Sequence, residues 1–540
     1  MGRLGPLQAA VDSALTRLQR AEAIPRLWRR DHTLWKPDPA EIADRLGWLD
    51  VAQVMSRELP GLRAFADEVR RDGYRHVVLL GMGGSSLGPE VLRQTFGSAP
   101  GYPQLIVLDS TIPAWVQAVT QAIVPARTLF LVSSKSGSTI EPLSFYKHFR
   151  RLVEEAVGST EAGRNFAAIT DSDTPLEKLA VQHGFRRVFL NPQDIGGRYS
   201  VLSLFGLAPA ALQGIDLRRL LDRSLAMREA CGPETAAADN PGAWLGATMA
   251  AMATEGRDKL TLVASPSMAG FGLWAEQLIA ESTGKENKGI VPVAGEPLAE
   301  PPAYGSDRLF VYVRLDGDDN EALDAAMTAL EASGQPVVRI PLRDSYDLGA
   351  EFFRWEFAVA IAGHLMGVHP FDQPNVQSAK DATERLLARR RKMSYLPLVE
   401  TPSTVRGLLQ QARPGDYLAI MAYLQETPEV DRALQELRLR VMRRYHIATT
   451  LGYGPRYLHS TGQLHKGGPN TGLFLQIIQA HPADIPIPGE DYTFGVLADA
   501  QALGDLHALQ VAGRRLARLT LASDYLDRAL SRLAQEADQP

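Results

Sequence analysis

Two short segments of this chain combine glycines with hydroxyl side chains in a way that suits phosphate binding. Residues 76–89 (HVVLLGMGGSSLGP) run from an apolar stretch into a turn of glycines and serines, and a proline then opens a helix-like segment. Glycines let backbone amides approach an anion closely, and the start of a helix favours negative charge. This pattern predicts a phosphate site at the turn.

The second segment, residues 129–139 (LFLVSSKSGST), leads from an apolar stretch into hydroxyls and Lys135. Hydroxyls and amides can surround phosphate oxygens while the lysine supplies positive charge. Alone, the segment is equally well explained as a polar loop in which Ser138 or Thr139 caps the next helix. Beside the first turn, it favours phosphate binding.

The first turn has two other interpretations, a dinucleotide site and a purely structural turn. Gly81 and Gly83 begin a G-x-G-x-x-G fingerprint, but Ser86 stands where the third glycine belongs. Asp109 does end the next strand-like run, as that fingerprint requires. The hydroxyl-rich second segment favours phosphate binding over both interpretations.

Three further residues could move protons or stabilise charge. Arg198 follows two glycines, so its guanidinium could project into a cleft and stabilise an oxyanion, or form a salt-bridged surface turn. Glu281 lies near the end of an expected helix, 274–282, and is either a general base or an ordinary solvated carboxylate. Lys380 shares a helical face with Val376 and alone is best explained as a surface lysine.

Residues 458–468 (LHSTGQLHKGG) hold two histidines among glycines. The spacing of His459 and His465 is a poor one for two metal ligands on the same face of a helix, and no third ligand is evident. A transition-metal site is therefore not expected. Histidine in a glycine-rich loop is a candidate acid–base group near neutral pH.

The composition limits which elements and partners to expect. The 540 residues are 45% hydrophobic and 22% charged with a net charge of −5, which is typical of a globular protein that binds neither nucleic acid nor membrane. No apolar run is long enough to span a bilayer, and no signal peptide is evident. The only cysteine, Cys231, excludes a disulfide framework and fits a reducing cytoplasm.

The elements that must position these residues alternate in type along the chain. Residues 1–72 read as helical. Strand-like runs then alternate with helices, which indicates parallel α/β structure. These runs are 77–80, 105–108, 128–132, 167–170, 188–190, 260–264, 309–313, 337–340, 417–423, 447–451 and 473–478. One strand–helix–strand unit, residues 417–423, 428–443 and 447–451, echoes another, residues 309–314, 321–332 and 337–340. Chance similarity explains this nearly as well as duplication does.

Together, six segments resemble the glucose-6-phosphate isomerase family. They are residues 81–89, 134–141, 194–200, 281–289, 371–380 and 458–463. The part from about residue 415 onward also resembles the isomerase half of bifunctional transaldolase/glucose-6-phosphate isomerase. The resemblance implies two doubly wound sugar-isomerase (SIS) domains with largely parallel sheets, at 73–256 and 257–540. The second would be rearranged or partly duplicated.

The resemblance also implies a role for each site residue. Glu281 would move a proton between C2 and C1 through a cis-enediolate, and Arg198 would stabilise the intermediate. Gln373 would hold sugar hydroxyls, while Lys380 and a histidine would open the pyranose ring. The sugar phosphate would bind Gly84, Ser85, Ser134, Lys135, Ser136 and Thr139.

The histidine departs from the family pattern. In the family it lies between the glutamate and the lysine, whereas here the Leu-His-Ser-x-Gly-Gln pattern follows Lys380. We expect that duplication or permutation moved this element, so that His459 fills the same place in space, with His465 in reserve. Asn375 and Gln377 also stand where the family usually has glycine and glutamate.

The expected function is interconversion of glucose 6-phosphate and fructose 6-phosphate in the cytoplasm. The reaction moves only protons, so it requires neither a metal nor another cofactor, and the resemblance implies a homodimer. One alternative is a broader phosphoglucose/phosphomannose isomerase. The other is a non-catalytic sugar-phosphate-binding regulator, which would not need Glu281, Arg198 and Lys380 together.

Overall fold

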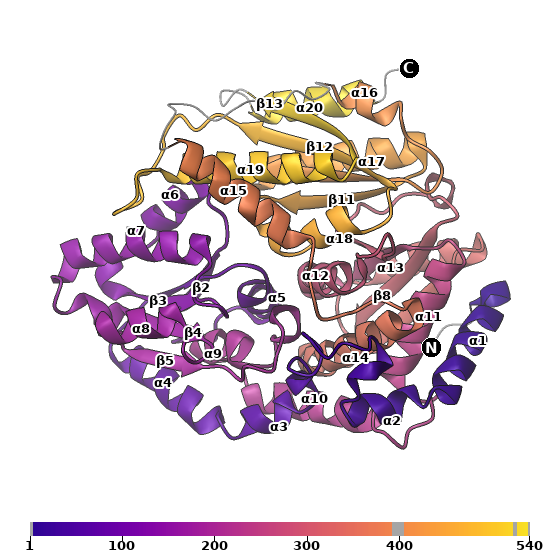
Figure 1. Cartoon of the computed structure of the whole chain (residues 1–540), viewed down its shortest axis with the longest axis horizontal. Coiled ribbons are helices and arrows are strands. Elements are labelled where there is room, and N and C mark those ends of the chain that lie inside the picture. The colour runs from indigo at the N-terminus through magenta and orange to yellow at the C-terminus, as the bar shows by residue number, and fades with distance from the viewer. Residues whose placement is uncertain (1–3, 391–403, 522–525, 538–540) are drawn as a thin grey trace.

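The structure, a computed structural model, describes residues 4–390, 404–521 and 526–537 (Figure 1). The predicted α/β class with parallel sheets is confirmed, since every strand pair within its three sheets is parallel. In Figure 1 the first sheet lies at the lower left, the second at the right and the third at the top. We call the parts built on them the first, second and third units.

The first unit has a five-stranded sheet of order β2-β1-β3-β4-β5. Its strands are β1 (His76–Leu80), β2 (Gln104–Leu108), β3 (Thr128–Ser133), β4 (Phe166–Thr170) and β5 (Arg187–Leu190), close to the predicted runs. Alternate residues of β1 enter two different cores, because helices cover both faces of the sheet. This double burial explains why the strands read as continuous apolar runs. The helices are α5 (Leu87–Phe96), α6 (Pro113–Ala122), α7 (Ile140–Val157), α8 (Pro175–Gln182) and α9 (Leu204–Leu212).

The second unit has a four-stranded sheet of order β7-β6-β8-β9. Its strands are β6 (Lys259–Ala264), β7 (Val291–Ala294), β8 (Arg308–Leu315) and β9 (Val337–Leu342), and its helices are α12 (Phe271–Thr283), α13 (Glu321–Ala332) and α14 (Leu348–Met366). Sequence reasoning missed β7, which is short and contains Pro292. Proline is tolerated there because β7 is an edge strand.

The third unit repeats that strand order as β11-β10-β12-β13. Its strands are β10 (Tyr417–Tyr423), β11 (Ala448–Tyr453), β12 (Gly472–Gln479) and β13 (Arg515–Leu521), and its helices are α16 (Val405–Leu409), α17 (Pro428–Tyr445), α18 (Gly462–Gly467), α19 (Phe494–Val511) and α20 (Leu526–Ala537). Arg515 and Arg518 interrupt the apolar pattern of the missed edge strand β13. Residues 257–540 therefore build two separate sheets of common strand order. This order matches β10 with β6 and β11 with β7, so the expected correspondence of residues 417–423 with 309–314 is wrong.

Helices outside the three sheets tie the units together. They are α1 (Gln8–Arg20), α2 (Ala23–Trp28), α3 (Val51–Ser56), α4 (Leu59–Arg71), α10 (Leu217–Ala230) and α11 (Pro241–Thr254). The described part of residues 1–72 contains helices and no strand, as expected. Helix α1 packs against α11, and its residues Val11, Leu15 and Leu18 are buried.

The third unit packs against both others. One face of β10 shares a hydrophobic core with Ile112 of the first unit and Val291 of the second. Helix α15 (Val376–Arg390) lies along α19 (Figure 1), and Leu387 joins the core that contains Phe494. The helical face expected to hold Val376 and Lys380 thus belongs to α15, which begins at Val376. No helix in the described ranges is long and apolar enough to cross a membrane.

Candidate active site

A cavity of about 720 Å³ brings most of the predicted residues together at the carboxyl ends of β1 and β3. The strand order of the first sheet reverses between these two strands, which is where open α/β sheets bind ligands. The predicted residues that line the cavity are Gly84, Ser85, Lys135, Ser136, Thr139, Arg198, Glu281, Gln373, Lys380 and His459. All three units and the α15 segment therefore contribute to one site.

The first turn needs its glycines for close approach. A Cβ atom on Gly84 would lie 2.0 Å from the carbonyl oxygen of Gly197, in the turn that carries Arg198. Gly83 has a φ of +55°, and a Cβ there would lie 2.9 Å from the carbonyl oxygen of His459. The turn after β1 therefore packs closely against the turn that carries Arg198 and the loop that carries His459.

Some side chains of the second turn hold the turn itself together, and others line the cavity. Ser134 does not line the cavity, because its hydroxyl accepts a hydrogen bond from the Gly137 amide at 3.1 Å and lies 2.9 Å from the Thr139 hydroxyl. Lys135 forms an ion pair with Asp171. Thr139 is the N-cap residue of α7 but makes no capping hydrogen bond with its side chain. The first amides of α7 therefore keep their capacity to bind an anion.

The guanidinium of Arg198 is buried and fully bonded, with 3% of the side chain exposed. Its Nε atom donates to Ser282 Oγ at 2.9 Å, and Nη1 donates to Glu281 Oε2 at 3.1 Å and to Gln373 Oε1 at 2.7 Å. Its Nη2 atom donates to the carbonyl oxygens of Pro370 and Asp372, each at 2.8 Å. A cation fixed by five hydrogen bonds is preorganised to stabilise negative charge.

Glu281 lies in the last turn of α12, with 9% of its side chain exposed. Burial raises the pKa of its carboxyl above the usual value, against the opposing effects of Arg198 and His459. Gln277, one turn earlier, donates to Glu281 Oε2 at 3.3 Å. A carboxylate with a raised pKa next to a fixed cation is suited to accept and return a proton.

His459 lies in the loop after β11, and its Nε2 atom is 2.9 Å from Glu141 Oε1. Burial tends to raise the pKa of the Glu141 carboxyl, but the His459 charge and hydrogen bond outweigh it, so that this pKa is lowered. His465 is buried outside the cavity, and burial places its pKa well below the usual value. Of the two candidate histidines, His459 is the one placed beside the other site residues.

Lys380 is exposed on α15 and lines the main cavity. It also lines an adjoining chamber of about 250 Å³, together with Glu141, His459 and Gln501. The lysine thus sits where the two spaces meet, on the α7 side of the site. Within the described residues, no group of three or more histidine, cysteine, aspartate and glutamate side chains could hold a metal ion.

Sequence reasoning gave no role to three polar residues at the site, Glu141, Gln277 and Gln501. An acidic residue in the first turn of a helix is ordinarily explained by the helix dipole, so Glu141 attracted no special attention. Gln277 is one turn before Glu281, a spacing that could have indicated it. No pattern in the sequence around Gln501 indicates a role at the site.

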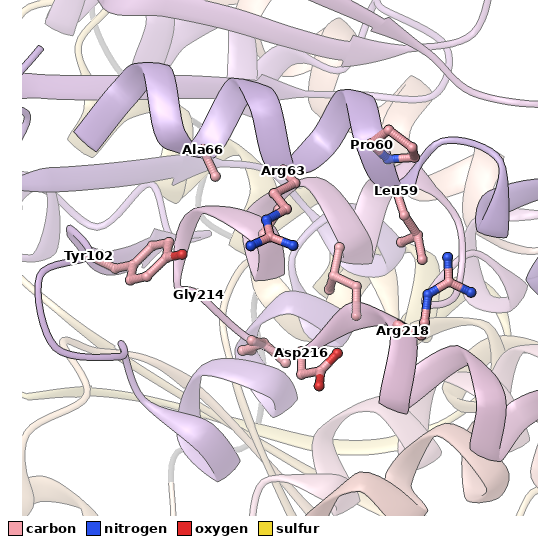
Figure 2. Close-up of a pocket in the computed structure, with 11 residues that line it drawn as sticks. Leu59, Pro60, Arg63, Ala66, Tyr102, Gly214, Asp216 and Arg218 are labelled. Carbon is pink, nitrogen blue, oxygen red and sulfur yellow. The ribbon is translucent and has the colours of Figure 1, made fainter. Parts of the chain in front are cut away.

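A separate cavity of about 540 Å³ contains none of the predicted residues (Figure 2). It lies between α4 and the α9–α10 connection, with Arg63, Tyr102 and Arg218 on its walls. Its side chains do not include a carboxylate paired with a cation. The cavity that collects the predicted residues is therefore distinguished by its chemistry.

Comparisons with known proteins show which proteins the chain is similar to. Residues 62–286 match the phosphoglucose isomerase family. The glucose-6-phosphate isomerase of Staphylococcus saprophyticus is 28% identical over 391 residues, covering 64% of this chain and 88% of that protein. A hypothetical protein of Thermus thermophilus superposes with a TM-score of 0.59 at 26% identity, covering 72% of this chain and 98% of that one. A glucose-6-phosphate isomerase of Chlamydia trachomatis, at 19% identity and a TM-score of 0.56, shares the fold over 73% of this chain and 87% of its own.

Proposed function

Because the chain resembles the glucose-6-phosphate isomerases, we propose that it interconverts glucose 6-phosphate and fructose 6-phosphate as an aldose–ketose isomerase. The observation that carries this proposal is the buried pair of Arg198 and Glu281, 3.1 Å apart, in the cavity that also holds His459 and Lys380. Moving a proton next to a carbonyl needs a base and a fixed cation to hold the enediolate. A protein that only sensed a sugar phosphate would have no use for such a pair.

In this proposal the substrate phosphate binds at the two glycine and serine turns. Gly84, Ser85, Ser136 and Thr139 line the cavity there, and the start of α7 adds its positive dipole end. Lys135 contributes charge while tied to Asp171, and Ser134 acts indirectly by holding the turn. Anchoring the phosphate positions the reacting carbons against the other wall of the cavity.

His459 and Lys380 then open the sugar ring. One group protonates the ring oxygen and the other accepts the proton of the O1 hydroxyl. Glu141 holds the histidine ring in place through the contact of its Oε1 atom with His459 Nε2 at 2.9 Å. Glu281 next removes the C2 proton and returns it to C1, while Arg198 stabilises the cis-enediolate and Gln373 binds sugar hydroxyls. Burial of Glu281 helps because it brings the carboxyl pKa towards the working pH.

A coupled assay tests this function directly. Purified protein should convert fructose 6-phosphate to glucose 6-phosphate, detected through a dehydrogenase that oxidises glucose 6-phosphate. Mannose 6-phosphate, offered in the same way, should be turned over at least tenfold more slowly; comparable turnover would identify the broader isomerase. Binding of fructose 6-phosphate without turnover of either sugar would identify the regulator instead.

A homodimer and a cytoplasmic location remain part of the proposal. The described cavity takes its base, cation, lysine and histidine from one chain, so a second copy would not be needed to assemble it. Mixing Glu281→Gln and His459→Asn variants tests this point. Sites built from single chains would stay inactive in the mixture, whereas sites shared across subunits would recover up to a quarter of the activity.

A further inference from the structure

The geometry points to Gln501 as a positioning residue that, through Glu141, fixes which nitrogen of His459 faces the substrate. This inference rests on the proposed function, in which His459 exchanges a proton with the sugar ring. Gln501 lies on α19 of the third unit, far in sequence from the α7 carboxylate that it contacts.

Two N–H donors converge on one oxygen of Glu141. Gln501 Nε2 lies 2.6 Å from Glu141 Oε1, and His459 Nε2 lies 2.9 Å from the same atom. Both Gln501 and Glu141 are buried, with 3% of each residue exposed. An oxygen that accepts from two nitrogens carries no proton of its own.

Thr111 sets the orientation of the Gln501 amide. Its hydroxyl donates to Gln501 Oε1 at 2.8 Å, which leaves the NH₂ group to face Glu141. With the amide turned round, its oxygen would face the carboxylate oxygen at 2.6 Å, and the two would repel. Thr111 is fully buried, so water does not compete for this hydrogen bond.

The tautomer of His459 follows from this arrangement. Because Glu141 Oε1 can only accept, His459 Nε2 must carry the hydrogen, and Nδ1 is unprotonated in the neutral ring. Nδ1 has no hydrogen-bond partner among the described residues, whereas the backbone oxygen of His459 is held by Gln277 at 2.9 Å. Nδ1 is therefore the atom that takes up and releases the substrate proton.

Other charged groups surround this arrangement from several elements. Lys380 on α15 acts electrostatically on Glu141, and Glu141 in turn acts on Tyr423 of β10. His459 acts on Glu281 across the cavity. Lys466 and Glu384 line the same chamber as Gln501. None of these groups replaces the amide hydrogen bond to Glu141 Oε1.

The test uses the full chain with two substitutions of Gln501. In Gln501→Leu, ¹⁵N spectra of the labelled histidines should show His459 changing from the Nε2–H form to a mixture of tautomers. We expect kcat with ring-closed substrate to fall about tenfold, which is less than the roughly 10²–10⁴-fold that a general acid–base group supplies, because His459 itself is still present. In Gln501→Glu, two carboxyl groups share one proton, so the high-pH side of the activity profile should move to lower pH than in wild type, as that proton is lost.

Gln476→Leu is the matched control. It removes another buried amide of the third unit, which donates to the Ala502 carbonyl at 2.9 Å, and should leave the pH profile and the His459 signal unchanged. If Gln501→Leu does not fold, Thr111→Val tests the same link by freeing the amide orientation. Wild-type tautomers and pH profiles in all folded variants would overturn the inference. The spectra do not depend on catalysis, so an inactive wild-type protein would refute the function without deciding this point.

Discussion

The second and third units share a strand order but supply the cavity from different places. In the second unit, the helix after the first strand, α12, carries Glu281. In the third unit, the loop after the second strand, β11, carries His459. One framework therefore provides a base from a rigid helix and an acid–base histidine from a loop.

The two units also differ at the carboxyl ends of their own strands. In the second unit this edge holds a depression of about 150 Å³, lined mainly by apolar residues such as Ala264 and Phe271. In the third unit Arg456 occupies the corresponding region and donates to both oxygens of Asp109 in the first unit, at 2.9 Å each. The same edge of two similar sheets is therefore an apolar depression in one unit and an ion-paired contact with the first unit in the other.

The largest expected effect comes from the second unit. Glu281→Gln keeps the shape of the side chain but removes the base, so kcat should fall about 10⁴-fold while binding of fructose 6-phosphate persists. The wild-type rate should itself fall at low pH, because a base with a raised pKa becomes protonated there. Steady-state assays and calorimetric binding measure both. A variant that isomerises at the wild-type rate would remove Glu281 from the mechanism.

The histidine of the third unit should have the next largest effect. His459→Asn removes the ring-opening group, and we expect kcat with ring-closed substrate to drop about 10²–10³-fold. His465→Asn, in a neighbouring buried position outside the cavity, is the control and should change kcat less than threefold at a temperature where it stays folded. Equal losses in the two variants would show that the comparison between histidines is wrong.

The contact between the first and third units can be tested by breaking the ion pair of Arg456 and Asp109. Arg456→Leu leaves Asp109, which is fully buried, without its partner, and should lower the free energy of unfolding by about 3–5 kcal/mol. Urea denaturation measures this loss. The double variant Asp109→Asn/Arg456→Leu should regain part of the stability, because no charge is left unpaired. A loss below about 1 kcal/mol in the single variant would mean that this ion pair does not stabilise the contact between the first and third units.

A smaller effect is expected at Glu276, a buried residue of α12 that faces Arg438 of α17 in the third unit. Burial raises the pKa of Glu276 to about 8, despite the opposing charge of Arg438. The folded protein then holds a proton that the unfolded chain releases, so this group's contribution to stability is lost as pH rises towards 8. Glu276→Gln should therefore gain about 2–4 °C in Tm relative to wild type between pH 5 and pH 8. A constant difference across that range would contradict the raised pKa.

Much of the fold could be read from local patterns. The buried strands β1, β3 and β10 are continuous apolar runs, and their predicted limits differ from the observed ones by a residue or less at each end. The strands that were missed, β7 and β13, lie at sheet edges, where one strand contains a proline and the other two arginines. Edge strands tolerate such residues because one side of their backbone is unpaired.

The candidate site likewise contains residues that local patterns indicated and residues that they did not. Sequence patterns indicated the phosphate turns, Arg198 and Glu281, because glycines, hydroxyls and charges gather there locally. The partners of His459 left no such trace, since Glu141 is 318 residues away from it in sequence and Gln501 is 360 residues away from Glu141. Nor could spacing separate His459 from His465.

Local sequence was enough to indicate which side chains are available and which turns can approach an anion, because these depend on residue type and near neighbours. Tertiary structure decided that three sheets place their loops around one cavity, that His459 enters it while His465 is buried elsewhere, and that Ser134 serves the turn. The reason is physical: burial and hydrogen-bond geometry arise from packing between segments distant in the chain, and no local pattern records that packing.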